Sequence, residues 1–213
     1  GEDLESLLKH ADTAMYRAKE QGGNTYRFYS PEMTARFRHR LSLEHELRQA
    51  LQEGQLFLMF QPELALVDGQ LTGLEALVRW RHPRLGMIRP TEFVPIAEDV
   101  GMMDELGDWV LRSACHHVAT WGEPLNGVRV AVNTSPFQLR KQGFDQRMMA
   151  IFDECSVSPE RFELELTETT MMQNVERTTD TLLALNQAGI LLTIDDFGTG
   201  YSSLSYLKRF AID

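Results

Sequence analysis

Cysteine, long apolar runs and blocks of basic residues are all scarce in this 213-residue sequence. The two cysteines, Cys115 and Cys155, stand in unrelated contexts without CxxC spacing, which argues against a disulfide scaffold or a zinc cluster and favours a reducing compartment. No apolar run approaches the roughly 20 residues that span a bilayer. The first residues, Gly1–Leu4, lack the basic segment of a signal peptide and read as the start of a piece cut from a longer chain.

The charge balance is acidic, with 21 basic and 31 acidic side chains and a formal net charge of −10. Without a Lys/Arg block, this balance argues against a protein that grips a long nucleic acid by its phosphates. If the substrate is an anion, bound cations or a few well-placed arginines must offset the repulsion. Hydrophobic residues make up 43% of the chain and include 11 Phe and 3 Trp, which favours a folded globular protein over disorder.

The first 54 residues are expected to differ from the rest. Apolar residues at helical spacing from Leu4 onward predict a helix that ends at Gly22–Gly23, and Asn24–Tyr29 predicts a short aromatic strand. One helix and one strand cannot bury a core alone, so residues 1–30 are interpreted as the tail of a domain whose body lies outside the sequence. Residues 31–54 are predicted to form a linker helix.

From residue 55 to 213, short apolar strands alternate with helical stretches, a pattern typical of an α/β fold with a parallel sheet. The first two predicted strands are expected to form an antiparallel hairpin through Val67–Gln70. The predicted strands are Leu56–Phe60, Leu71–Trp80, Val128–Asn133, Phe162–Thr167 and Leu191–Asp195, and the predicted helical runs are 91–100, 104–121, 143–155, 174–188 and 203–209.

Oxygen-bearing side chains stand at or near the ends of four of these strands. They are Glu75, Asn133, Glu165, Asp195 and Asp196. In a parallel α/β barrel the carboxyl ends of the strands converge on one face, so these side chains can meet in one pocket. Carboxylate and amide oxygens suit hard cations such as Mg²⁺, Mn²⁺ or Ca²⁺ rather than zinc. Two such cations would clamp the attacking and leaving oxygens of a phosphodiester.

The residues alone leave plainer alternatives open. Asp195–Asp196 before Phe197–Gly198 also fits a turn with a helix N-cap, and Asn133–Pro136 is a common N-cap sequence. Glu163, next to Glu165 in an alternating strand, is interpreted as part of a solvated face.

Six motifs in order along the chain resemble the signature of EAL domains, the cyclic di-GMP phosphodiesterases. They are Phe60–Pro62, Leu74–Pro83 with its Glu-Ala-Leu, Glu92–Glu98, Val132–Ser135, Glu163–Glu168 and Asp195–Leu204. The resemblance covers residues 55–213. Upstream, Ala11–Lys19 with Gly22 and Asn24 is similar to the last helix and strand of a GGDEF domain, whose nucleotide motifs are absent, so no cyclase activity is implied.

This resemblance implies a TIM-barrel-like fold, incomplete in this chain and with an antiparallel first strand, that hydrolyses cyclic di-GMP to linear pGpG with Mg²⁺ or Mn²⁺ in bacterial second-messenger signalling. It implies that Glu168 anchors the loop after Asp196. By motif position, the implied metal ligands are Glu75, Asn133, Glu165, Asp195 and Asp196; the catalytic residues are Glu75, Asp195, Asp196 and Glu168; and the substrate contacts are Gln61, Leu77 and Arg79.

The sequence ends at Asp213, before the Lys-Ile-Asp motif whose lysine assists the attacking water in this family. The complete parent protein is therefore expected to be an enzyme, and the chain 1–213 by itself to be inactive. The alternative is a non-catalytic receptor that relays cyclic di-GMP binding by a conformational change. Receptors of this family typically lose metal ligands, whereas every ligand position within this sequence is intact, which favours the enzyme. We further expect a cytoplasmic homodimer formed through residues 55–213, with any membrane anchor upstream.

Overall fold

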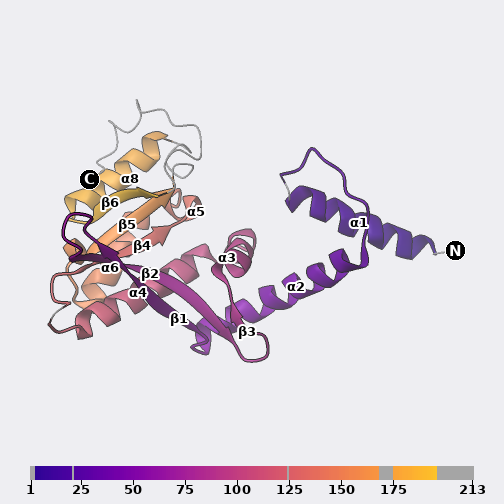
Figure 1. Ribbon diagram of the computed structural model, residues 1–213. Helices are drawn as coiled ribbons and strands as arrows, with labels where there is room; N and C mark the ends of the chain where they lie inside the picture. The colour runs from indigo at the N-terminus through magenta and orange to yellow at the C-terminus, as the bar shows by residue number, and fades with distance from the viewer. Residues whose placement is uncertain (1–2, 21, 124, 168–174, 196–213) are drawn as a thin grey trace. The chain divides into compact units, whose positions relative to one another are not determined.

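The computed structural model describes residues 3–20, 22–123, 125–167 and 175–195, and the chain divides into two units, residues 1–49 and 50–213 (Figure 1). Within these described ranges, none of the helices has both the length and the apolar character that crossing a membrane requires.

The first unit contains helix α1 (Leu4–Glu20) and most of helix α2 (Pro31–Gln52). Ala14 and Ala18 of α1 are buried, and the His10 ring stacks on Tyr29 with 3.7 Å between ring centroids. The predicted strand Asn24–Tyr29 is wrong, because residues 25–30 carry no regular secondary structure. A strand needs a neighbour to pair its backbone groups, and the described residues of this unit form helices only.

The second unit is built on one mixed sheet in the order β1-β2-β4-β5-β6, with β3 paired to β2. β1 and β2 are antiparallel, as predicted, and β2, β4, β5 and β6 are parallel to one another. In the part of the chain that is described, β1 and β6 are free edges and the sheet is not closed. The strands are β1 (Leu56–Leu64), β2 (Leu71–His82), β3 (Gly86–Ile88), β4 (Arg129–Thr134), β5 (Phe162–Thr167) and β6 (Leu191–Asp195).

The helices of this unit follow the predicted runs to within one residue at each end, and the predicted run 203–209 lies outside the described residues. Two short segments, α5 and the 3₁₀ turn η1, and the strand β3 were not predicted, because each is only three or four residues long. The helices are α3 (Pro90–Asp99), α4 (Met103–Thr120), α5 (Pro136–Leu139), α6 (Phe144–Cys155) and α8 (Val175–Gln187), with η1 at Pro159–Arg161.

The core lies between the sheet and the helices that pack on one of its faces. Along β5 every second residue, Phe162, Leu164 and Leu166, is buried, and the Phe162 ring lies 4.9 Å from that of Phe152 in α6. Each such side chain contributes about 1.5–3 kcal/mol on burial. Because side chains alternate along a strand, the residues between them point to the opposite face of the sheet.

Candidate active site

The face of the sheet opposite the helices brings together polar side chains from neighbouring strands. Asn133 of β4 is paired in register with Glu165 of β5, and Gln61 of β1 is paired with Glu75 of β2. The Asn133 amide nitrogen donates a hydrogen bond to Glu75 Oε1 over 2.8 Å. The register therefore carries residues from four distant stretches of sequence to one place near the carboxyl ends of the parallel strands.

Asp195 lies on the same face, at the end of the last described strand. It is paired with Thr167, two residues beyond the pair formed by Glu165 and Thr193. Its negative charge acts directly on the Glu165 carboxyl group. The other two predicted catalytic acids, Asp196 and Glu168, lie outside the described residues.

The electrostatics of this face centre on Glu165. Burial, followed by the negative charges of Glu75, Glu63, Asp195 and Glu163, raises the pKa of Glu165 from an ordinary value near 4.5 to about 8. Its Oε2 atom is buried without a hydrogen-bond partner, as is the Oγ1 atom of the register neighbour Thr193. Buried polar atoms without partners are uncommon in folded proteins, so this pair fits a site that binds a polar or charged group.

Two further acids belong to this face and were not predicted to do so. Glu163 is half-buried rather than part of a solvated face. Glu63 of β1 is paired with Gly73 of β2. Burial and the charges of Glu163 and Glu75 raise the pKa of Glu63. A Cβ atom at Gly73 would collide with the Glu63 carboxylate, so glycine makes room for it. Residues two apart on a strand share a face, so a strand that continued past Gln61 would have placed Glu63 beside it. The predicted strand ended at Phe60, and Glu63 was therefore missed.

The donor set fits a hard divalent cation. It consists of carboxylate oxygens and one amide, with an unpartnered buried oxygen at Glu165 and mutual repulsion that a cation would relieve. Among the described residues, no three His, Cys, Asp or Glu side chains are grouped closely enough to hold one ion. Asn133 directs its amide nitrogen at Glu75, and its amide oxygen is the atom that would bind a cation.

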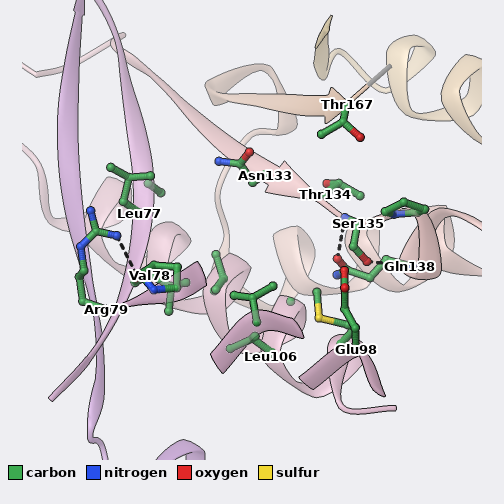
Figure 2. A pocket seen from close by; sticks show the side chains of 17 residues that line it. Leu77, Val78, Arg79, Glu98, Leu106, Asn133, Thr134, Ser135, Gln138 and Thr167 are labelled. Carbon is green, nitrogen blue, oxygen red and sulfur yellow. Dashed lines mark hydrogen bonds between the residues drawn. The ribbon is translucent and has the colours of Figure 1, made fainter. Parts of the chain in front are cut away.

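A cavity of about 400 Å³ opens beside these residues, where β2 leaves β4 (Figure 2). The two strands pair only over Gly73–Ala76 of β2, so the remainder of β2 separates from the sheet. Figure 2 shows Leu77, Val78 and Arg79 on one side of the gap and Asn133 on the other. The lining residues are Ala76–Arg79, Pro90, Val94, Glu98, Met103, Leu106, Gly107, Val110, Asn133–Pro136, Gln138 and Thr167.

Two of the predicted substrate-binding residues, Leu77 and Arg79, line this cavity, whereas Gln61 stands beside Glu75 instead. Arg79 is half-buried and donates from Nη1 to the Val78 carbonyl oxygen at 2.9 Å. Glu98 is an additional polar group of the cavity, and burial together with the Asp99 charge raises its pKa. The cavity is thus mostly apolar with a few polar groups, which is the usual character of a site for a small molecule.

The segment after Asn133 is held in place by a helix cap. Ser135 caps α5: its Oγ accepts the Gln138 backbone N–H at 3.4 Å, and the Gln138 Oε1 atom accepts the Ser135 N–H at 3.1 Å. The N-cap alternative from the sequence therefore applies to Ser135, while Asn133 still faces Glu75. A Cβ atom at Gly107 of α4 would collide with the Gln138 amide, so the glycine admits the close approach.

Comparisons with known proteins place the chain in a family. The sequence profile described as EAL domain matches residues 44–213. An uncharacterized signaling protein of Caulobacter vibrioides is 44% identical over 213 residues, covering 100% of this chain and 26% of that protein. The cyclic di-GMP phosphodiesterase NbdA of Pseudomonas aeruginosa is 43% identical over 216 residues, covering 100% of this chain and 27% of that protein. The chain thus spans about a quarter of the length of these curated relatives.

A solved structure titled "PaMucR Phosphodiesterase, c-di-GMP complex" superposes with a TM-score of 0.76 at 40% sequence identity, covering 80% of this chain and 70% of that one. The described sheet and helices therefore have the mixed α/β architecture of that solved structure.

Proposed function

The chain belongs to the EAL domain family, and from that premise we propose that the complete parent protein hydrolyses cyclic di-GMP to linear pGpG with the help of Mg²⁺ or Mn²⁺. The observation that carries the proposal is the unpartnered, buried Glu165 Oε2 within a group of oxygen ligands beside the cavity. Relatives named as cyclic di-GMP phosphodiesterases support the reaction class.

The proposed cation ligands are Glu75, Asn133, Glu165 and Asp195, with Asp196 next to the last of them in sequence. A divalent cation held there would polarise the phosphodiester and favour a hydroxide form of bound water. Glu168 is proposed to anchor the loop that follows Asp196. The strand register holds Glu75, Asn133 and Glu165 in rigid positions, which supports precise placement of these groups around the reacting phosphate.

The chain's own side chains would bind and orient the dinucleotide. Arg79 supplies a positive charge on the rim of an acidic site, where it can donate charge-assisted hydrogen bonds to a phosphate oxygen. Leu77 and the other apolar residues of the cavity offer a dry surface for a flat base. Gln61 is paired with Glu75 across β1 and β2, and its side-chain amide can donate a hydrogen bond to an oxygen of the ligand.

The organisation of the parent stays part of the proposal. We propose residues 1–30 as a remnant of a GGDEF domain, 31–54 as a linker helix and 55–213 as part of the EAL domain, working as a homodimer in the cytoplasm. The division of the chain at residues 49 and 50 supports a boundary close to the expected one.

The test is hydrolysis of labelled cyclic di-GMP by the complete parent protein, with Mg²⁺, with Mn²⁺ and with a chelator, and the chain 1–213 assayed beside it is expected to form no product. The expected result is a single linear product, pGpG, that forms only with a cation present. Binding of cyclic di-GMP without any product under all three conditions would instead identify a receptor. Absence of both binding and hydrolysis would remove the proposal.

A further inference from the structure

A row of ion pairs joins helices α4 and α6 on the outer side of the sheet. Arg147 of α6 bridges Asp104 at 2.7 Å and Asp108 at 3.1 Å, and Arg112 pairs with Glu154 one helical turn or more further along. Because residues four apart share one side of a helix, Asp104, Asp108 and Arg112 define the face of α4 that is turned to α6.

The two cysteines lie close to these ion pairs along their helices. Cys115 follows Arg112 by three residues and Asp108 by seven, and Cys155 follows Glu154 directly and Arg147 by eight. The three-residue spacing puts Cys115 on the same side of α4 as Arg112. Cys155, at the end of α6, follows the buried residues Ile151 and Phe152 by four and three positions, which puts it on the buried side of its helix. Cys115 is buried, and Cys155 is partly exposed. The cysteines stand in unrelated contexts in the sequence, and it is the packing of α4 on α6 that brings their thiols together.

The electrostatics of Cys115 agree with this placement. Burial, then the charge and hydrogen bonding of the Cys155 thiol, raise the pKa of Cys115 to about 12, while the nearby Arg112 charge lowers it. Cys115 is thus a protonated thiol in contact with its partner in the reduced protein.

We propose that Cys115 and Cys155 form a dithiol that peroxides or small disulfides oxidise to an intramolecular disulfide, which makes the α4–α6 contact a covalent modification site. Disulfides of proteins in reducing compartments are typically transient and respond to oxidants, so the proposal is compatible with the compartment expected from the cysteine content.

With hydrogen peroxide, the Cys155 thiolate sulfur attacks one peroxide oxygen. A sulfur–oxygen bond forms, the oxygen–oxygen bond breaks, and the departing hydroxide takes a proton to become water. The Cys115 sulfur then attacks the Cys155 sulfur, the sulfur–oxygen bond breaks, and the second hydroxide takes the Cys115 proton. In total, two thiols and one peroxide give one disulfide and two waters, and the two electrons pass from sulfur to peroxide.

The structure assigns the order of these steps. Cys155 reacts first, because it is the thiol that solvent reaches. When it becomes a neutral sulfenic acid, its negative charge no longer opposes ionisation of Cys115, and Arg112 continues to favour the thiolate. Cys155 is also the last residue of α6, and helix ends fray more readily than helix interiors, which helps the sulfurs to approach each other.

The test treats the protein with one equivalent of hydrogen peroxide and, separately, with oxidised glutathione at low protein concentration. The expected result is loss of both titratable thiols, an intact mass lower by two hydrogen atoms, and a tryptic product in which residues 113–129 are joined to residues 148–161 until a reductant is added. The oxidised protein should unfold at a higher temperature than the reduced one, because the bond restricts the unfolded chain.

Cys155→Ser is the matched control, since its partly exposed position tolerates the change. It should keep the reduced protein's unfolding temperature and lose both the joined peptides and the oxidation-dependent increase. The proposal is overturned if wild-type Cys155 accumulates as a sulfinic acid or a glutathione adduct while Cys115 remains titratable after unfolding. It is equally overturned if the only disulfide formed joins two chains.

Discussion

Asn133 donates a hydrogen bond to Glu75 over 2.8 Å, although 58 residues separate them in the sequence. The contact depends on parallel pairing of β2 with β4, which ends at Ala76, and it lies at the point where the cavity begins. The amide thereby holds the Glu75 carboxylate at the junction between the acidic face and the cavity. A phosphate bound at this junction would lie next to both the acidic face and the cavity.

In the complete parent protein, replacing Glu75 by Ala should abolish turnover of cyclic di-GMP and leave the fold intact. The side chain supplies one oxygen of the proposed cation site, and water cannot restore its geometry, so the expected loss of kcat is about a hundredfold or more. Steady-state kinetics together with a circular dichroism melting curve measure both effects. Asp153→Asn, an exposed acid of α6, is the control and should change neither. Undiminished hydrolysis by the Glu75→Ala protein would contradict the assignment.

Replacing Arg79 by Ala should act on substrate binding more than on the chemical step. A charge-assisted hydrogen bond is worth about 1.5–3 kcal/mol, so KM should rise about 10- to 100-fold with a smaller change in kcat. Arg79→Lys should recover part of the affinity, since it keeps the charge but not the planar fork. An unchanged KM in Arg79→Ala would place the substrate phosphate elsewhere. Arg38→Ala, on the exposed side of α2, is the matched surface control.

The five longer strands and the longer helices could be predicted because each is encoded by a local pattern. Alternation along Phe162–Thr167 and the apolar run at Leu191–Asp195 need no knowledge of the rest of the chain. Their parallel pairing also followed from the helices between them, and it brings Glu165 and Asp195 to one face. The sequence analysis needed only the direction of the strands to predict that these carboxylates lie at one edge of the sheet.

Features that depend on pairing or packing between distant residues could not be predicted. Asn24–Tyr29 has the composition of a strand, but the described residues around it offer no neighbour to pair with. Glu63 joins the acidic face because β1 continues past Phe60 in register with β2. The contact between Cys115 and Cys155 depends on how α4 packs against α6, which cannot be predicted from the spacing of the two residues in the sequence.

In the cation-free protein, stability should fall as the pH rises from about 4.5 to about 8. The folded state raises the pKa of Glu165 to about 8, so it binds this proton more tightly than the unfolded chain does. The contribution is therefore fully present below the unfolded pKa and is lost as the pH passes through the folded pKa.

Glu165→Gln removes this titration and serves as the test. Its unfolding temperature should match the wild type at about pH 4 and exceed it by about 2 °C or more at pH 8.5, measured by calorimetry in a chelator. Adding Mg²⁺ or Mn²⁺ should reverse the difference, since the cation stabilises only the wild-type carboxylate. A wild-type protein as stable at pH 8.5 as the variant, without cations, would show that the folded state does not raise the pKa of Glu165.

Gly107→Ala should destabilise the protein even though alanine favours helices. Inside a helix the substitution normally stabilises by about 1 kcal/mol. Here the added Cβ collides with the Gln138 amide, which must turn away and release the Ser135 N–H that it accepts. A buried donor left unsatisfied costs about 1–3 kcal/mol, and the cap keeps only its bond from the Gln138 N–H to the Ser135 hydroxyl oxygen. The cost exceeds the gain, so the unfolding temperature should fall by about 2–4 °C or more.

A second background separates the collision from other effects of the substitution. In a Gln138→Ala protein the obstacle is gone, so Gly107→Ala should become neutral or stabilising, and the coupling between the two sites should be about 1 kcal/mol or more. Gly122→Ala, whose Cβ would meet nothing within 4 Å, controls for the general effect of replacing a glycine. Because Gly107 and Gln138 both line the cavity, the single Gly107→Ala variant should also bind cyclic di-GMP more weakly. Equal destabilisation by Gly107→Ala in both backgrounds would show that Gln138 does not require the glycine.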